Sequence, residues 1–339
     1  MAKEENTKYD NLNKWLLINH SIIKEKCTFD HFMINCFDWN KKEDNIKNID
    51  IKDINREESN ILLGSYLAGL FEGDGHIWIP KDTFKKKHNP RFCITFHEKN
   101  LPLAKVILCV IGSGFIRIKN KENAVVLTIS SIKGHMVILN LIGKYLRTPK
   151  IYQVNNLINW LNLHKNINFS LKMKNEKPIN TDYWLSGFID ADGGFLINYI
   201  ENKKNQKVNI KFTLTIEQRM KDPKSGESYE SILKIIANYL NVKLNIRKQK
   251  LTGNYYYRIV GSSIISRSII NNYLEKYPLL SSKYLDYIDW KEGSLIYTQN
   301  KPLTNINIIK IKKLKMSMKN KRTSYNWDHL YKSKIFVFK

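Results

Sequence analysis

Cysteine is scarce in this chain and long apolar runs are absent, and both shortages exclude classes of protein. The 339 residues include 4 cysteines, which have neither CxxC spacing nor histidine partners at zinc-finger intervals. We therefore expect free thiols in a reducing compartment, without a disulfide framework or a zinc site. The longest apolar run, Val106 to Ile111, is far shorter than the ~20 residues that cross a bilayer. We expect no membrane partner.

Negative charge is also scarce. Lys and Arg number 56 against 31 Asp and Glu, which gives a formal net charge of +25. The simplest partner of such an excess is a polyanion, and nucleic acid is the leading candidate. An anionic membrane surface or plain solubility would explain the charge alone equally well. The length suffices for two ordinary domains with their own cores.

Two short segments, 66–75 and 184–193, are near copies of each other: YLAGLFEGDG and WLSGFIDADG. Each contains two small residues four positions apart, Gly69 and Gly73 in the first copy and Gly187 and Ala191 in the second. Positions four apart share a helix face, and small residues there let two helix backbones approach closely. The pattern is best known from membrane helices, but these apolar stretches are too short to span a bilayer. We predict a pair of packed helices in a soluble protein.

An aspartate and a glycine close each copy. Gly75 and Gly193 fit a helix end, because glycine tolerates the left-handed conformation found there. Asp74 and Asp192 would then lie in the last turn, where the helix dipole disfavours a carboxylate. If the helices pack side by side, the two acids converge and need a cation. Carboxylates suit Mg²⁺, or another divalent cation such as Mn²⁺, and a metal pair can drive phosphodiester hydrolysis.

The segments that follow each copy also correspond. Strands are predicted at 77–79 and 91–96, and again at 195–200 and 208–216. Helices follow at 101–110 and 231–240, and second strand pairs begin at 115–119 and 244–248. The sequence therefore predicts an α+β fold of two αββαββα repeats related by a pseudo-twofold axis. Each repeat would hold an antiparallel four-stranded sheet, and the two would pack through the motif helices.

The predicted boundaries divide the chain into five parts. They are an N-terminal extension (1–60), a first repeat (61–165), a linker (166–181), a second repeat (182–298) and a basic C-terminal tail (299–339). The dense basic run from Lys310 to Arg322 is either a solvated tail or an additional phosphate clamp.

Polar and basic side chains alternate with apolar ones along the predicted strands, so one sheet face would be basic. This is either a solvated face or a surface that lies in a DNA major groove. The candidate DNA contacts are Lys85, Lys87, Arg91, Arg117, Lys119, Lys203, Lys211, Arg219, Arg247, Lys248 and Arg258.

These residues together resemble the LAGLIDADG homing endonucleases in their single-chain form with two motifs, here at 67–75 and 185–193, over about residues 60–295. The resemblance implies a monomer that cuts both strands of a long double-stranded DNA target. It implies divalent metals bound by Asp74 and Asp192, with Gly73 and Ala191 also at the metal site. Relatives are usually intron-encoded, often in fungal mitochondria, so a mitochondrial location is implied as well.

The resemblance also implies further catalytic residues. The family places a basic residue five positions after a proline of the closing segment, and Lys283 stands five after Pro278. The first half departs from this, because Val154 stands five after Pro149; either Lys150 substitutes or this half-site works without a lysine. Polar residues expected to order water near the metals are Glu98 and Gln218. Such asymmetry predicts unequal strand cleavage or nicking.

Two other functions compete with the endonuclease. An RNA maturase that assists splicing of its host group I intron would use the same basic charge without the acids, and both activities could coexist. A catalytically inactive DNA-binding scaffold is the other alternative, but it leaves the retention of both aspartates without a reason.

Overall fold

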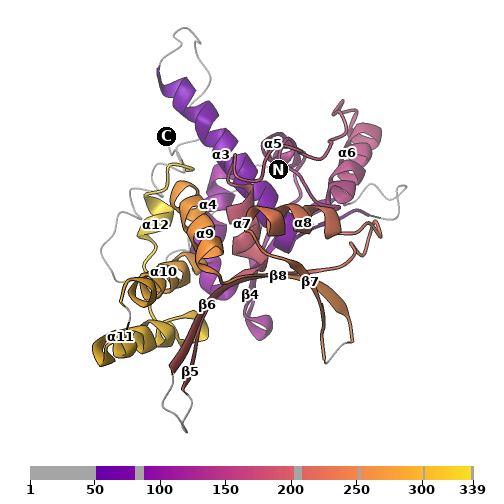
Figure 1. Cartoon of the computed structure of the whole chain (residues 1–339). Helices are drawn as coiled ribbons and strands as arrows, with labels where there is room; N and C mark the ends of the chain where they lie inside the picture. The colour runs from indigo at the N-terminus through magenta and orange to yellow at the C-terminus, as the bar shows by residue number, and fades with distance from the viewer. Residues whose placement is uncertain (1–50, 81–87, 202–207, 251–252, 301, 337–339) are drawn as a thin grey trace. The chain divides into compact units, whose positions relative to one another are not determined.

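A computed structural model describes residues 51–80, 88–201, 208–250, 253–300 and 302–336 (Figure 1). The predicted DNA contacts Lys85, Lys87 and Lys203 lie outside these residues. The first repeat consists of α3 (Ile51–Asp74), β1 (Gly75–Trp78), β2 (Arg91–His97), α4 (Leu101–Ile111), β3 (Phe115–Lys119), β4 (Ala124–Ile129), α5 (Ile132–Ile142) and α6 (Ile151–Lys165).

The second repeat has the same order of elements. It consists of α7 (Trp184–Asp192), β5 (Gly193–Glu201), β6 (Val208–Arg219), α8 (Glu230–Tyr239), β7 (Leu244–Lys248), β8 (Tyr255–Gly261), α9 (Ile264–Lys276) and α10 (Lys283–Gln299). Two more helices follow, α11 (Asn305–Met316) and α12 (Asp328–Tyr331).

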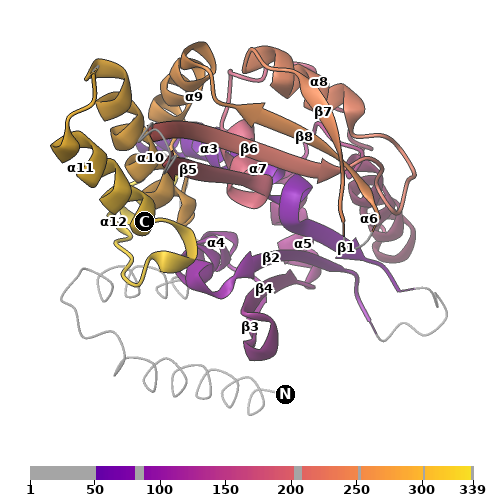
Figure 2. The same cartoon turned by 60° about the horizontal axis from the view of Figure 1, so that its bottom comes forward.

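Each repeat forms one four-stranded sheet. The strand orders are β1-β2-β4-β3 and β5-β6-β8-β7, and every pairing is antiparallel. The predicted α+β fold of two αββαββα repeats is therefore confirmed. Figure 2 shows both sheets from the strand side, with α3 and α7 behind β5 and β6.

Serine caps fix the corresponding turns of the two repeats. Ser131 accepts a hydrogen bond from the amide of Gly134 at the start of α5, and Ser263 accepts one from the amide of Ser266 at the start of α9. Such caps satisfy amide groups that the helix itself leaves without a partner. Because both caps stand in the same place, they provide a common origin for comparing the repeats.

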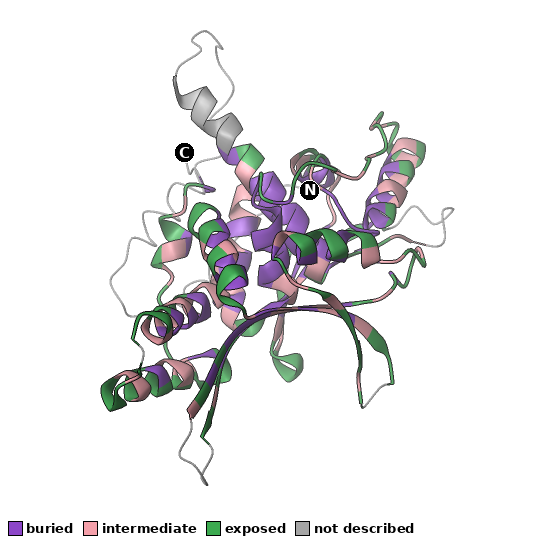
Figure 3. Cartoon of the chain, viewed as in Figure 1, coloured by how far each residue is buried: buried purple, intermediate pink, exposed green. Residues whose placement is uncertain are grey.

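The motif helices α3 and α7 pack backbone to backbone at their small residues. A Cβ atom on Gly69 would overlap the carbonyl oxygen of Trp184, and one on Gly187 would overlap that of Tyr66. Figure 3 shows α7 and the C-terminal part of α3 as buried segments at the centre of the picture. The packing predicted from the paired small residues is confirmed.

The basic run after residue 310 is not a solvated tail. Ile311 of α11 is fully buried, and α11 packs against α10 and β5. Arg322 pairs with Asp286 and Asp289 through its Nη2 atom, at 3.4 and 2.5 Å. Charge density along the sequence was misleading here, because part of the charge pairs inside the fold.

The helices and cysteines of the structure bear on two expectations from the composition. No helix among the described residues is both long and apolar enough to cross a membrane. Cys93 is a buried free thiol as expected. Cys109 takes part in a disulfide, so the expectation of free thiols was wrong for that residue.

Candidate active site

Asp74 and Asp192 end α3 and α7, and helix packing brings these ends together. The Asp192 carboxylate lies 3.4 Å from the position that a Cβ on Gly73 would take. Burial, reinforced by the negative charge of Asp74, raises the pKa of Asp192 to about 7. Partial desolvation also raises the pKa of Asp74, whose side chain is exposed. Two acids in this setting favour either a proton or a bound cation.

A lysine reaches the end of each motif helix. Lys283 Nζ donates to the carbonyl oxygens of Ile189 (3.1 Å) and Ala191 (2.7 Å). Lys150 Nζ donates to those of Phe71 (3.2 Å), Gly73 (2.5 Å) and Gly75 (2.8 Å). A cation at a helix C-terminus is stabilised by the helix dipole. The positive charge of both lysines offsets part of the rise in the pKa values of the two aspartates. Each half-site therefore carries its own ammonium group.

A second pair of carboxylates shows how the lysines correspond. Glu72 accepts hydrogen bonds from the amides of Arg147 and Thr148, and Asp190 accepts them from the amides of Leu280 and Ser281. Each lysine stands two residues after the second of these amides. Counting from the prolines hid this match, because the two prolines do not occupy equivalent places.

These inner carboxylates also cross-link the motif helices. Trp184 Nε1 donates to Glu72 (2.6 Å) and the Tyr66 hydroxyl donates to Asp190 (2.8 Å). Glu72 and Asp190 are buried, and their oxygens are occupied by donors from the fold. Sequence reasoning missed this structural role, although both acids stand two positions before the closing aspartate.

Gln218 and Glu98 have different surroundings. Gln218 is buried and its Nε2 donates to Asp192 at 2.6 Å. Glu98 is exposed at the start of a 3-10 turn (Glu98–Asn100). Within the described part of the chain, Glu98 has no side-chain hydrogen bond to Asp74 or to any other residue. The structure thus brings Gln218 to the acids and leaves Glu98 apart.

Strand register explains this difference. Phe92 pairs with Ile129, and Leu214 pairs with Gly261. Ile129 and Gly261 each precede a capping serine by two residues, so Phe92 and Leu214 are counterparts. Gln218 stands four residues after Leu214, so its counterpart is Phe96, which stands four residues after Phe92. The alignment that paired Gln218 with Glu98 was shifted by two residues.

The open face of the first sheet carries three of the predicted DNA contacts. Arg91, Arg117 and Lys119 line a hollow of about 290 Å³ together with Trp78 and Phe115. The guanidinium of Arg91 lies 5.3 Å from the centroid of the Trp78 ring, a cation–π distance. This face combines cations with aromatic surface.

The open face of the second sheet carries most of the others. Alternation along the paired strands puts Lys211, Arg219, Arg247 and Arg258 on it. Arg247 and Arg258 both pair with Glu217, at 2.8 and 3.6 Å. One predicted contact is displaced: Lys248 lies on the opposite face, because it pairs with Tyr255 rather than with a residue of the open face.

The two aspartates suit a hard divalent cation whose remaining ligands come from water and the substrate. No group of three or more His, Cys, Asp or Glu side chains that could hold a metal occurs among the described residues. The carbonyl oxygens of Gly73 and Ala191, predicted at the metal site, each accept a lysine ammonium. Mg²⁺ is commonly held by one or two carboxylates with water and phosphate oxygens, and Asp74 and Asp192 supply that number.

Comparison with known proteins gives the family. The LAGLIDADG endonuclease family model matches residues 67–161 and 185–294. The intron-encoded DNA endonuclease aI3 of Saccharomyces cerevisiae is 32% identical over 306 residues, covering 79% of this chain and 72% of its own. A cox1 intron-2 protein of Schizosaccharomyces pombe is 33% identical, covering 74% and 71%. The chain belongs to the LAGLIDADG endonuclease family, as the two motifs predicted.

A solved structure and a relative of another kind add to this. The meganuclease I-SmaMI, bound to uncleavable DNA, has a TM-score of 0.57 at 20% identity and covers 76% of this chain and 99% of its own. It shows the same fold. The intron-encoded RNA maturase bI4 of S. cerevisiae is 27% identical over 164 residues, which is 48% of this chain and 23% of that protein.

Proposed function

We propose that this protein is a site-specific endonuclease that hydrolyses both strands of a long double-stranded DNA target in intron homing. One observation carries the proposal: Asp74 and Asp192 meet at two helix ends, each with its own lysine. Both half-sites lie on one chain, so we propose a monomer, with the repeats at 61–165 and 182–298 separated by the linker 166–181.

Asp74 and Asp192 would bind the divalent cations, Mg²⁺ or Mn²⁺. Such ions, when bound, activate water and neutralise the leaving oxygen of a phosphodiester. Gln218 holds one oxygen of Asp192 and so orients its carboxylate. Lys150 and Lys283 place positive charge where the scissile phosphates develop negative charge, and positioned charge of this kind stabilises a transition state. Glu98 is exposed and would act only through water.

The two open sheet faces would hold the duplex. Arg91, Arg117 and Lys119 act from the first sheet. Lys211, Arg219, Arg247 and Arg258 act from the second. Cations that contact phosphates release counterions on binding, so affinity should fall steeply with salt. Contacts from residues 85, 87 and 203 remain part of the proposal.

Cleavage of the intronless allele of the host gene tests this function. With Mg²⁺ the protein should give double-strand breaks, and Asp74→Asn and Asp192→Asn should each reduce cleavage by about 1000-fold, or about 4 kcal/mol of barrier. Binding of the same duplex in Ca²⁺ should persist in both variants. Parental cleavage rates in both variants would refute the site.

A second function, maturation of the host group I intron, is favoured by the similarity to bI4. It would use basic surface and not the acids, so intron RNA should bind Asp74→Asn and Asp192→Asn as well as the parent. Loss of RNA affinity in these variants would contradict it. Relatives named for a cox1 intron and an ND4 intron support a mitochondrial location for either activity.

A further inference from the structure

We propose that residues 317–336 form a strap that positions Lys283, so that the second half-site depends on the C-terminal segment for its geometry. The inference rests on the proposed endonuclease function for its catalytic consequence. We define the strap as residues 317–336 and the second closing segment as residues 277–285, which contain Lys283.

His329 is where the strap contacts the closing segment. Its Nε2 lies 3.1 Å from the carbonyl oxygen of Ser281, and its ring stacks on Tyr284 with centroids 4.3 Å apart and planes 12° apart. Trp327 stacks on the same imidazole at 5.6 Å. Ser281 and Tyr284 stand on either side of Lys283 in the chain. The strap therefore contacts the backbone on one side of the lysine and a side chain on the other.

Both ends of the strap are anchored. At its start, the amide of Lys319 donates to Asp286 at 3.0 Å, and Arg322 pairs with Asp286 and Asp289 of α10. At its far end, Ile335 is fully buried and its carbonyl oxygen accepts a hydrogen bond of 2.6 Å from Ser59 of α3. Because the strap is held at both ends, it can hold the closing segment in place where His329 contacts it.

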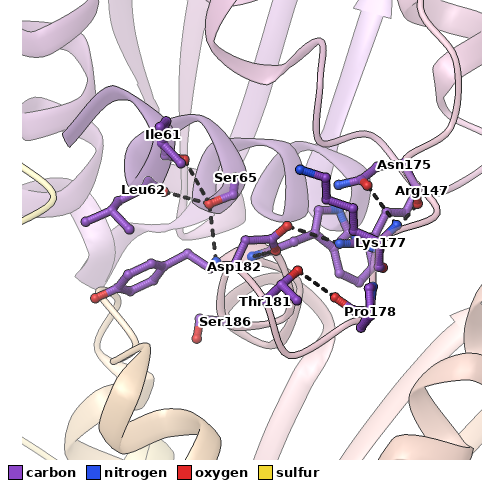
Figure 4. A network of polar contacts seen from close by, with 12 residues as sticks. Ile61, Leu62, Ser65, Arg147, Asn175, Lys177, Pro178, Thr181, Asp182 and Ser186 are labelled. Carbon is purple, nitrogen blue, oxygen red and sulfur yellow. Dashed lines mark hydrogen bonds and ion pairs between the residues drawn. The ribbon is translucent and has the colours of Figure 1, made fainter. Parts of the chain in front are cut away.

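The closing segment of the first repeat is braced from a different part of the chain. Arg147 donates to the carbonyl oxygens of Asn175 (3.3 Å) and Lys177, and pairs with Asp182 at 3.0 Å (Figure 4). The linker between the repeats thus does for Lys150 what the strap does for Lys283. Because each brace serves one lysine, damage to the strap should affect one half-site.

Strand-resolved cleavage tests the inference. His329→Ala removes both the contact with Ser281 and the stacking, and His329→Phe keeps a ring without the polar contact. We expect one DNA strand to be cut about 10-fold more slowly in His329→Ala, less than the ~100-fold that a 1 Å misplacement can cost. The other strand should be cut within about twofold of the parent rate, and His329→Phe should fall between.

Lys332→Ala is the matched control, because Lys332 lies three residues away, is exposed and pairs only with Asp328 among the described residues. It should cut both strands like the parent. Equal slowing of both strands by His329→Ala would overturn the inference. So would a loss of DNA affinity with a shallower salt dependence, which is the result expected of a phosphate clamp.

Hydrogen exchange gives a readout that does not require cleavage. The amides of Leu280, Ser281 and Lys283 donate within the closing segment and to Asp190, and we expect them to exchange faster in His329→Ala than in Lys332→Ala. Unchanged exchange would refute the strap. If the parent protein cuts no DNA, the proposed function fails while this measurement still decides whether the strap exists.

Discussion

Lys150 directly follows Pro149, whereas Lys283 stands five residues after Pro278, yet both ammonium groups reach the last carbonyls of a motif helix. The carboxylates of Glu72 and Asp190 account for this. Each holds the backbone two residues before the lysine. The position of a functional side chain is therefore set by buried contacts of the closing segment and not by its distance from a proline.

The two half-sites differ in what surrounds this shared frame. Asp192 accepts a hydrogen bond from Gln218, while Asp74 accepts none from the side chains that the structure describes. One closing segment is braced by the linker and the other by the strap. Equal acids and lysines with unequal surroundings predict two strands cut by similar chemistry at different rates.

The contact between the motif helices is where the two halves are most alike, and damage there should be largest. Gly187→Val and Gly69→Val each place a side chain against a backbone oxygen of the other helix. Since backbone oxygens cannot rotate away, we expect each to lower the free energy of unfolding by about 3 kcal/mol or more, the upper end for overpacking. Urea denaturation followed by circular dichroism measures this.

Gly194→Ala is the control for these substitutions. A Cβ on Gly194 meets no atom within 4 Å, so its stability should stay within about 0.5 kcal/mol of the parent. A strong effect of Gly187→Val with a weak effect of Gly69→Val would show that the helix contact is less symmetric than the structure indicates.

Exchanging one lysine at a time compares the half-sites directly. Lys150→Met should slow cleavage of one DNA strand by about 100-fold, and Lys283→Met should slow cleavage of the other strand by the same factor. This is equivalent to about 2.7 kcal/mol. Single-turnover assays with each strand labelled provide the rates, and duplex affinity in Ca²⁺ checks that the fold is retained. Parental cleavage by Lys150→Met would mean that the first half-site works without its lysine.

Gln218 tests the asymmetry itself. Gln218→Leu removes the hydrogen bond to Asp192 and should slow one strand by about 10-fold, or 1.4 kcal/mol. Glu98→Gln should change either rate by less than about twofold, because Glu98 lies exposed and apart from both acids. If Glu98→Gln instead slows one strand as strongly, Glu98 reaches the site in the DNA complex and the two halves are more alike.

The periodic and repeated features of the sequence were sufficient to predict the two repeats, the order of helices and strands along the chain, and the convergence of Asp74 and Asp192. The order of the strands within each sheet was not predicted and comes from the structure. Paired small residues specify a helix contact, and the glycine after each aspartate does stand at a helix end. The left-handed conformation expected there was wrong, because Gly193 is extended (φ −84°, ψ 159°) and begins β5 directly, and Gly75 likewise has no positive φ. These signals are local, and the repetition of the motif supplied the long-range information.

Contacts between distant segments could not be predicted in this way. The sequence left Lys150 as one of two alternatives for the first half-site. The structure favours Lys150, because the backbone held by Glu72 brings its ammonium group to the carbonyl of Gly73. The two-residue shift between Glu98 and Gln218 arises from strand register, which the alternation of side chains does not reveal. Arg322 stood in a run of lysines, and only folding shows its pairing with Asp286.

His135 and Arg267 offer the smallest test of the comparison between the repeats. The amide of His135 donates to the carbonyl oxygen of Ser131, and the amide of Arg267 donates to that of Ser263, so the two residues are counterparts. His135 is fully buried, and burial lowers its pKa to about 4. The folded state therefore disfavours the charged imidazole. The contribution of neutral His135 to the free energy of unfolding is fully present above pH ~6.5 and is lost as the pH falls toward 4.

When the pH falls from ~7.5 to ~5.5, we expect the free energy of unfolding of the parent protein to decrease by about 1 kcal/mol more than that of His135→Leu. Urea unfolding without divalent ions at the two pH values measures it, and both proteins share every other titrating group. Arg267→Gln is the control from the second repeat: guanidinium stays charged across this range, so its stability should be lower than that of the parent by a constant amount. A pH-dependent difference for Arg267→Gln, or none for His135→Leu, would mean that acid sensitivity does not distinguish the first repeat from the second.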